Sequence, residues 1–385
     1  MSINVGFSGD VSFSGIFNNC SRKDFMDPDI ISFFRANDFN VFNVEGPLTS
    51  SPKRDKEGIS LLSHTSHITI FRKFHGVIFN LANNHIMDAG VSGLEETLSL
   101  ANKEEIKAFG SGLNLEEASR PIILEKEKVK VAMIAVCHRE GPIAEGNSPG
   151  IFCETQQDAI RDVIEDCRSK FDWVVLNYHG GEEFTFVPMP SRRKKFIKYL
   201  DYGVDVIIAH HPHVVQGYEE IGEKTIFYSL GNFIFDIPDH LVFEGTEESV
   251  SLRILFEKES FSFVPLFTKI DRKTGNVNTL KDNYRFFAIK SNQYNSLWSE
   301  ECKRVMRKQF QNSMGRKLIN NNRKLAFLND LPSKLQKPLR YLKFFYSSFR
   351  IKNPYQRAFV IGSIKSFWPC LRNNEGSNSK GCSKT

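Results

Sequence analysis

Short apolar segments alternate with amphipathic ones along the first 270 residues of the chain, and this pattern predicts a mixed α/β fold. Apolar runs typical of strands lie at residues 3–7, 39–44, 76–82, 173–176 and 206–209. Apolar residues at helical spacing lie at 28–36, 93–101 and 156–169, and alternation typical of β-hairpins lies at 120–137 and 249–270. Strands with continuous apolar runs, separated by helices, favour a parallel sheet that is covered on both faces.

The predicted strands end in residue types that bind metals. In chain order these residues are Asp10, Glu45, Asn84, His85, His179, His211 and His213. Ligands of open α/β sheets gather outside the carboxyl ends of the strands, so we expect these side chains to lie close together. Each segment taken alone has another interpretation, namely a Gly-Asp turn at Asp10, an Asn-rich helix cap at Asn84 or a solvated loop at the histidines.

The most prominent of these segments is the apolar run at 206–209, which is followed directly by His210, His211, Pro212 and His213. Because side chains alternate along a strand, His211 and His213 are expected to point the same way and His210 the other way. His138 ends the first hairpin and is a weaker candidate for the same rim, since a lone histidine after a strand is usually a polar loop residue.

The combined donor set contains carboxylate, amide and imidazole groups and no thiolate. Such a mixed oxygen and nitrogen set suits one or two divalent ions of manganese, iron or zinc. Two ions about 3.5–4 Å apart would form the clamp that is used in the hydrolysis of phosphate esters.

Composition narrows the class of protein further. A hydrophobic content of 41% in 385 residues is typical of a globular chain with a sizeable core. The seven cysteines are odd in number and include no Cys-x-x-Cys pair, which argues against a disulfide framework. No secretory signal and no apolar run long enough to span a membrane are found, so the sequence predicts a cytoplasmic protein.

The charge is distributed unevenly along the chain. Residues 1–270 hold 27 Lys and Arg against 39 Asp and Glu, whereas residues 271–385 hold 24 against 6. We therefore predict an acidic domain over 1–270, a basic helical extension over 271–372 and a disordered tail over 373–385. The extension is expected either to contact an anionic membrane surface or polymer-synthesis machinery, or to pack on the acidic body. Nucleic acid is not an expected partner, because no recognised binding motif accompanies the charge.

Six motifs in order resemble the CapA family of capsule and poly-γ-glutamate synthesis proteins, which belongs to the calcineurin-like metallophosphoesterases. They are Gly9-Asp10, Asn43-Val44-Glu45-Gly46, LANNHIMDAG at 81–90, HGGEEF at 179–184, HHPHVVQG at 210–217 and YSLGNFIFD at 228–236. The resemblance covers roughly residues 3–270. It implies a four-layer αββα sandwich, followed here by the basic and mainly helical extension.

The resemblance also implies roles for single residues. Asp10 would bind one metal, Asn84 and His179 a second, Glu45 would bridge them, and His211 and His213 would complete the set. His85 would stabilise the transition state or protonate the leaving oxygen, with Asp88 orienting it, and the nucleophile would be a metal-bound hydroxide. The residues expected beside the ligands are Asn43, Glu183, His210 and Asn232.

Three positions depart from the family pattern. Ser12 stands where the phosphoesterases have histidine, Glu45 where they have a bridging aspartate, and Gly180 where the family usually has tryptophan. Two hypotheses follow for the function. The first is a metal-dependent hydrolase that acts on a phosphoester or a related bond in a cell-surface polymer pathway, with an anionic polymer or a phosphoester as substrate. The second is a metal-binding accessory or assembly factor in polymer synthesis without turnover.

Overall fold

The structure is a computed structural model that describes residues 2–18, 24–50, 59–138 and 141–305. The chain divides into two compact units, Met1–Ser291 and Asn292–Thr385. In the second unit the described residues include a helical segment over 294–305. The remainder of the predicted basic extension and the predicted disordered tail over 373–385 lie outside the described residues.

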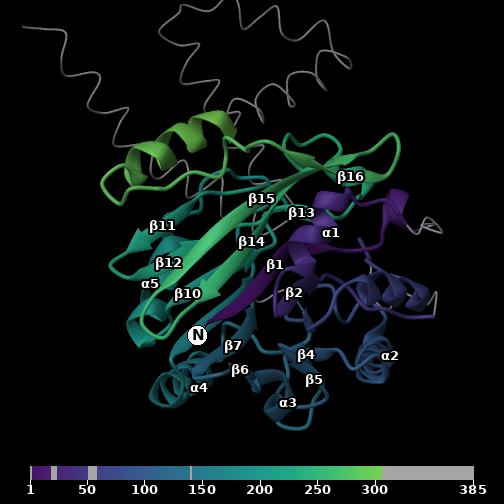
Figure 1. Cartoon of the computed structure of the whole chain (residues 1–385), viewed down its shortest axis with the longest axis horizontal. Coiled ribbons are helices and arrows are strands. Elements are labelled where there is room, and N and C mark those ends of the chain that lie inside the picture. The colour runs from purple at the N-terminus through teal and green to yellow at the C-terminus, as the bar shows by residue number, and fades with distance from the viewer. Residues whose placement is uncertain (1, 19–23, 51–58, 139–140, 306–385) are drawn as a thin grey trace, which may run out of the picture. The chain divides into compact units, whose positions relative to one another are not determined.

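The first unit is built on two large sheets (Figure 1). One has eight strands, β16 (Asn276–Leu280), β15 (Phe261–Asp271), β14 (Glu248–Phe256), β1 (Ile3–Val11), β2 (Phe39–Val44), β3 (Val77–Asn80) and β4 (Lys107–Phe109) in that order, with β13 (Asn232–Ile234) also paired to β1. The other has six, in the order β11 (Tyr218–Ile221), β12 (Lys224–Phe227), β10 (Val206–His210), β9 (Trp173–His179), β7 (Val129–Cys137) and β6 (Ile122–Lys126). A two-stranded pair joins β5 (Ser111–Gly112) to β8 (Gly150–Ile151).

Helices cover the outer faces of both sheets, and the predicted αββα sandwich is confirmed. On the first sheet, Phe34 of α1 (Pro28–Arg35) packs on Phe42 of β2 with ring centroids 5.2 Å apart. On the second, Phe196 of α5 (Pro190–Tyr202) packs on Tyr178 at 4.9 Å. The other helices are α2 (Gly90–Lys103), α3 (Leu115–Ser119), α4 (Gln157–Lys170) and the 3-10 turns η1 (Gly15–Phe17), η2 (Thr65–Lys73) and η3 (Pro238–His240).

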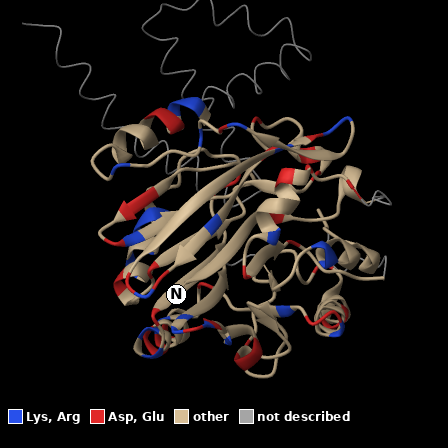
Figure 2. Ribbon diagram, in the orientation of Figure 1, with Lys and Arg blue, Asp and Glu red and all other residues tan. Residues whose placement is uncertain are grey.

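The strands of the second sheet alternate between two apolar environments. Val206 and Ile208 of β10 belong to the core shared with the first sheet, whereas Ile207 and Ala209 do not. In β9, Val175 belongs to that shared core, and Tyr178 faces α5. Side chains two residues apart share a face, so His179 and His210 are expected to continue the inner faces of their strands. Figure 2 shows that charged residues lie mainly on the helices and loops, while the central strands are largely uncharged.

The first unit extends beyond the boundary predicted near residue 270. β16 pairs with β15 through the register Asp271↔Asn276 to Phe267↔Leu280, and it lies in the segment that was expected to begin a helical extension. A strand whose backbone groups complete the ladder of a neighbour belongs to that sheet, whatever the local charge. The unit therefore ends at Ser291.

Two further observations concern the described residues. Cys137, Cys153, Cys167 and Cys302 are buried, and none of the four forms a disulfide within the described part of the chain. None of the helices in the described ranges combines the length and the apolar character that crossing a membrane requires.

Candidate metal centre

Asp10 is held at the carboxyl end of β1 by the strands on either side of it. The register of the sheet places Asp10 beside Asn43 of β2 and beside Asn232 of β13. The side-chain amide of Asn43 donates to Oδ1 of Asp10 at 2.9 Å, and Asn80 of β3 donates to Oδ1 of Asn43 at 2.9 Å. This row of amides orients the carboxylate of Asp10, which is fully buried.

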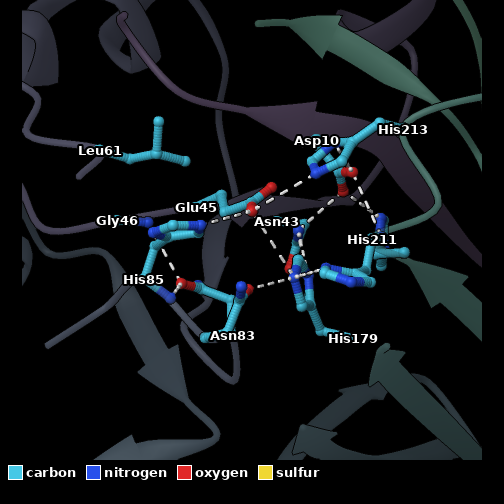
Figure 3. Close-up of polar contacts among 12 residues, drawn as sticks. Asp10, Asn43, Glu45, Gly46, Leu61, Asn83, His85, His179, His211 and His213 are labelled. Carbon is cyan, nitrogen blue, oxygen red and sulfur yellow. Dashed lines mark hydrogen bonds and ion pairs between the residues drawn. The ribbon is translucent and has the colours of Figure 1, made fainter. Parts of the chain in front are cut away.

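Glu45 follows β2 in a turn that Asn83 organises. Oδ1 of Asn83 accepts from the backbone N–H of Gly46 at 3.2 Å, and its Nδ2 donates to the carbonyl of Val44 at 2.8 Å. Gly46 has φ 89°, and a Cβ there would lie 2.2 Å from the carbonyl oxygen of Leu61, so only glycine fits. The turn directs the buried carboxylate of Glu45 toward the histidines of the second sheet (Figure 3).

His179 ends β9 and meets side chains from the first sheet. Its Nδ1 lies 3.2 Å from Nδ2 of Asn43, and its Nε2 lies 2.9 Å from Oδ1 of Asn84. Nδ1 of His211 lies 3.2 Å from the same Nε2, and Oε1 of Glu45 lies 3.7 Å from it. Nε2 of His179 thus lies close to donor atoms of three residues that are distant in the sequence, Glu45, Asn84 and His211.

His211 and His213 point into the centre by a different route from the one predicted. β10 ends at His210, so strand alternation does not orient the two side chains. Both have positive φ, 93° for His211 and 56° for His213, which is uncommon for residues with a Cβ and concentrates at functional sites. The carbonyl of Pro212 between them accepts from the backbone N–H of Phe184 at 2.8 Å, which secures the turn.

His213 is further fixed by Asn232, as predicted for a residue beside the ligands. Nδ1 of His213 lies 2.9 Å from Oδ1 of Asn232, whose Nδ2 donates to the carbonyl of Thr246 at 2.8 Å. The Nε2 of His213 is left facing Oε1 of Glu45 at 3.9 Å. Asn232 therefore sets the orientation of this ring.

The expectation that His210 faces away from the centre is wrong. Its Nδ1 lies 3.0 Å from Oδ1 of Asp10. The reason is the alternation of β10, because His210 shares the inner face with Val206 and Ile208. Glu183 was also expected beside the ligands, and its side chain is exposed.

Two overlapping groups of buried donors result. One consists of Glu45, His179 and His211, and the other of Asp10, Glu45 and His213, with the ligand atoms of each within 4.8 Å of one another. Both groups share Glu45. Two fully buried carboxylates lie among imidazole nitrogens in these groups, and a mixed oxygen and nitrogen set of this kind suits a divalent cation. The residues present therefore fit one or two metal ions.

The second group has three donors without a contribution from Ser12. The serine is buried two residues after Asp10, and its hydroxyl has no hydrogen-bond partner among the described residues. Asp10 nevertheless has a neighbouring nitrogen, since Nδ1 of His213 lies 3.5 Å from its Oδ2. The three ligands of this group come from positions 10, 45 and 213 without residue 12.

His85 lies at the edge of the centre and is held by Asp88. Nδ1 of His85 lies 2.6 Å from Oδ2 of Asp88, which also accepts from the backbone N–H of Leu61 at 2.8 Å. Nε2 of His85 faces Oε1 of Glu45 at 3.9 Å (Figure 3). The side chain of His85 is 12% exposed, whereas those of His179 and His213 are 0% and 4% exposed. His85 is thus the histidine of the centre that a substrate can reach.

The sequence pattern missed Asn83 and His240. His240 of η3 packs on His213 with ring centroids 4.4 Å apart and stacks on Phe235 at 5.3 Å. The doubled asparagine before His85 was a signal for Asn83, because a polar residue directly after a buried strand needs partners. His240 follows the last motif in a stretch without periodicity, and only the folded loop brings it near His213.

Burial favours the neutral form of the candidate ligand histidines. It lowers the pKa of His179 and His211 well below the usual value, and the neighbouring imidazoles, His138 first, lower the pKa of both further. Burial also lowers the pKa of His213, against the opposing effect of Asp10. A neutral imidazole is the form that binds a metal.

These shifts predict how the stability of the metal-free chain depends on pH. Above about pH 6.5 both folded and unfolded histidines are neutral, but below it the unfolded chain takes up protons that the native chain cannot. With EDTA present, the free energy of unfolding is therefore expected to fall as the pH drops from 7.5 to 5.5. In urea unfolding, the free energy of unfolding of His211→Asn should fall over this pH range by about 1.4 kcal/mol less than that of the wild-type chain, an average of about 0.7 kcal/mol per pH unit. An unchanged slope would contradict the assignment of a neutral His211.

The stretch of the chain that holds these residues is similar to known proteins. The family described as bacterial capsule synthesis protein PGA_cap matches residues 4–237. The PGA biosynthesis protein CapA of Bacillus subtilis (strain 168) is 32% identical over 209 residues, or 53% of this chain and 54% of that protein. The capsule biosynthesis protein CapA of Bacillus anthracis is 27% identical over 222 residues, or 55% and 54%.

A "probable polyglutamine synthesis accessory protein" of Mycobacterium tuberculosis (strain CDC 1551 / Oshkosh) is 24% identical over 215 residues, or 52% of this chain and 56% of that protein. The chain spans about half the length of the curated relatives that it matches. The stretch matched by the family includes every predicted ligand from Asp10 to His213, and it covers more than half of the chain. The chain therefore belongs to the bacterial capsule synthesis protein family PGA_cap.

Proposed function

We propose that this chain is a CapA-like protein of capsule or poly-γ-glutamate-type polymer synthesis and that it hydrolyses a phosphoester or a related bond with a divalent metal. The observation that carries the proposal is the pair of buried donor groups that share Glu45, with Nε2 of His85 only 3.9 Å from the shared carboxylate. The names of the relatives in Bacillus support the pathway.

The residues of the centre would have two roles, metal binding and proton transfer. Asp10, Glu45, Asn84, His179, His211 and His213 would hold the metal. A divalent cation bound there supplies polarisation of the phosphoryl oxygen and activation of water at neutral pH. Asn43 and Asn232 keep Asp10 and His213 in their orientations, so that the donors are arranged before a substrate arrives.

His85 would transfer a proton to the leaving oxygen from Nε2. Its Nδ1 is engaged by Asp88, which leaves Nε2 as the atom that faces the centre. Asp88 is itself anchored to the backbone of Leu61, so the ring cannot rotate freely. This arrangement has the geometry of a general acid whose orientation is set by a carboxylate.

Hydrolysis by the full chain tests the proposal. We expect a generic phosphodiester or phosphomonoester to be hydrolysed after addition of Mn²⁺, with the activity lost in EDTA and restored by excess Mn²⁺. Metal analysis of the purified chain should find one or two ions per chain. Absence of turnover with Mn²⁺, Fe²⁺ and Zn²⁺ alike would contradict the proposal that the chain is a hydrolase.

Ser12 favours a second candidate function, that of a metal-binding accessory factor. Its hydroxyl replaces an imidazole that the related phosphoesterases have at this position, so the group at Asp10 has fewer strong donors than theirs. A metal-binding accessory factor without turnover would retain ion binding in the metal analysis and show no hydrolysis with any of the three metals. The same experiment therefore separates the two functions.

A further inference from the structure

His138 contacts two predicted metal ligands and has no role in the centre described so far. It follows directly after β7, and its side chain is buried. Its backbone N–H donates to the carbonyl of His179 at 2.9 Å. Its ring packs edge-on against His211, with centroids 4.6 Å apart and planes inclined by 65°. His138 thus contacts the imidazole of His211 and the backbone of His179, two residues of one donor group.

The ring of His138 occupies space that a side chain at position 180 would need. A Cβ on Gly180 would lie 2.6 Å from Cγ, 2.7 Å from Cβ and 2.7 Å from Nδ1 of His138. Such distances are far below van der Waals contact, so the ring and a side chain at 180 exclude each other. Glycine at this position is therefore what allows the ring of His138 to approach that of His211.

The adjacent glycine shows that this crowding is specific to position 180. Gly181 also has positive φ, 140° against 155° for Gly180, so both share a backbone that favours glycine. A Cβ on Gly181 would meet only Pro212, at 3.2 Å from its Cγ. Backbone freedom is thus common to both positions, whereas the conflict with His138 occurs at one.

His138 is not a member of either donor group. The groups found among the described residues are Glu45 with His179 and His211, and Asp10 with Glu45 and His213. His211, in contrast, is a ligand on a strained turn with φ 93°, whose ring needs packing partners to keep one orientation. An edge-on ring contact is directional and can provide this.

We propose that His138 is a positioning residue of the metal centre, whose ring, admitted by Gly180, holds His211 in the orientation that binds metal. The proposal rests on the proposed metal centre. It assigns a packing function to the ring, so phenylalanine should replace histidine here, and alanine should not. Residues that orient metal ligands typically change metal affinity by about 10–100-fold when they are lost.

Co²⁺ titration of the full chain tests this inference, because the visible spectrum of the ion reports ligand geometry independently of turnover. We expect His138→Ala to bind Co²⁺ at least about tenfold more weakly and with an altered spectrum. His138→Phe should retain the affinity of the wild-type chain. Gly180→Ala should behave like His138→Ala, and Gly181→Ala, the matched control, like the wild-type chain. Thermal unfolding of each metal-free variant shows which of them fold.

The outcomes separate this inference from the function on which it rests. If the wild-type chain binds no Co²⁺, the metal centre and the role of His138 both fail. If the wild-type chain binds the ion and His138→Ala binds it with the same affinity and spectrum, the role of His138 alone is overturned. Equal losses in folded His138→Ala and His138→Phe would overturn positioning by ring packing.

Discussion

Glu45→Gln is expected to lower the affinity of the chain for Mn²⁺ by about two to three orders of magnitude, because Glu45 belongs to both donor groups. The substitution keeps the shape of the side chain and removes one negative charge. A unit charge about 4 Å from another contributes about 4 kcal/mol at an effective dielectric constant near 20, and about 1.4 kcal/mol corresponds to one order of magnitude. Isothermal titration with Mn²⁺ measures the change.

The same substitution is expected to stabilise the metal-free chain. Glu45 is fully buried, and burial of a carboxylate without a cation is unfavourable, so its neutral isostere should raise the melting temperature in EDTA. With Mn²⁺ the order should reverse, since the wild-type chain gains stability from binding. Glu95→Gln, an exposed position on α2, is the control and should change neither value. Glu45→Gln with the metal affinity of the wild-type chain would contradict the shared role.

The strand-end pattern predicted the centre because parallel strands bring their carboxyl ends to one edge. Asp10 and Glu45 on the first sheet and His179 on the second needed no knowledge of the loops, since each lies at the carboxyl end of a buried strand or directly after it. The amide row from Asn80 through Asn43 to Asp10 depends on the register between strands. Register between distant strands is a tertiary property that local sequence does not specify.

The errors arise where the chain leaves regular structure or where a pairing partner is far away. His211 and His213 reach the centre through positive φ, which is set by the contact between Pro212 and Phe184 and not by local periodicity. The boundary near residue 270 followed a change in charge, but β16 joins the sheet because β15 offers an open edge. Charge describes which surfaces meet solvent or partners, and backbone pairing decides where a domain ends.

His85→Ala is expected to lower kcat for phosphoester hydrolysis by about 10²–10⁴-fold while it leaves the binding of Mn²⁺ unchanged. The reason is that His85 lies outside both donor groups and yet faces Glu45 with Nε2 at 3.9 Å. A general acid acts only as the bond to the leaving oxygen breaks, so its loss should be largest for substrates with poorly acidic leaving groups. Parallel assays with a phenol and an alkyl alcohol as leaving group measure this difference.

Asp88→Asn separates the orientation of His85 from its chemistry. The amide can still occupy the space of the carboxylate, but it loses the charged contact of 2.6 Å with Nδ1. We expect a smaller loss of kcat than in His85→Ala, with the same dependence on the leaving group, because the proton donor remains and only its orientation is weakened. His75→Gln, an exposed histidine before β3, should behave as the wild-type chain. If His85→Ala loses activity equally for both leaving groups, or loses Mn²⁺, His85 is not the proton donor, and its role lies in holding the centre together.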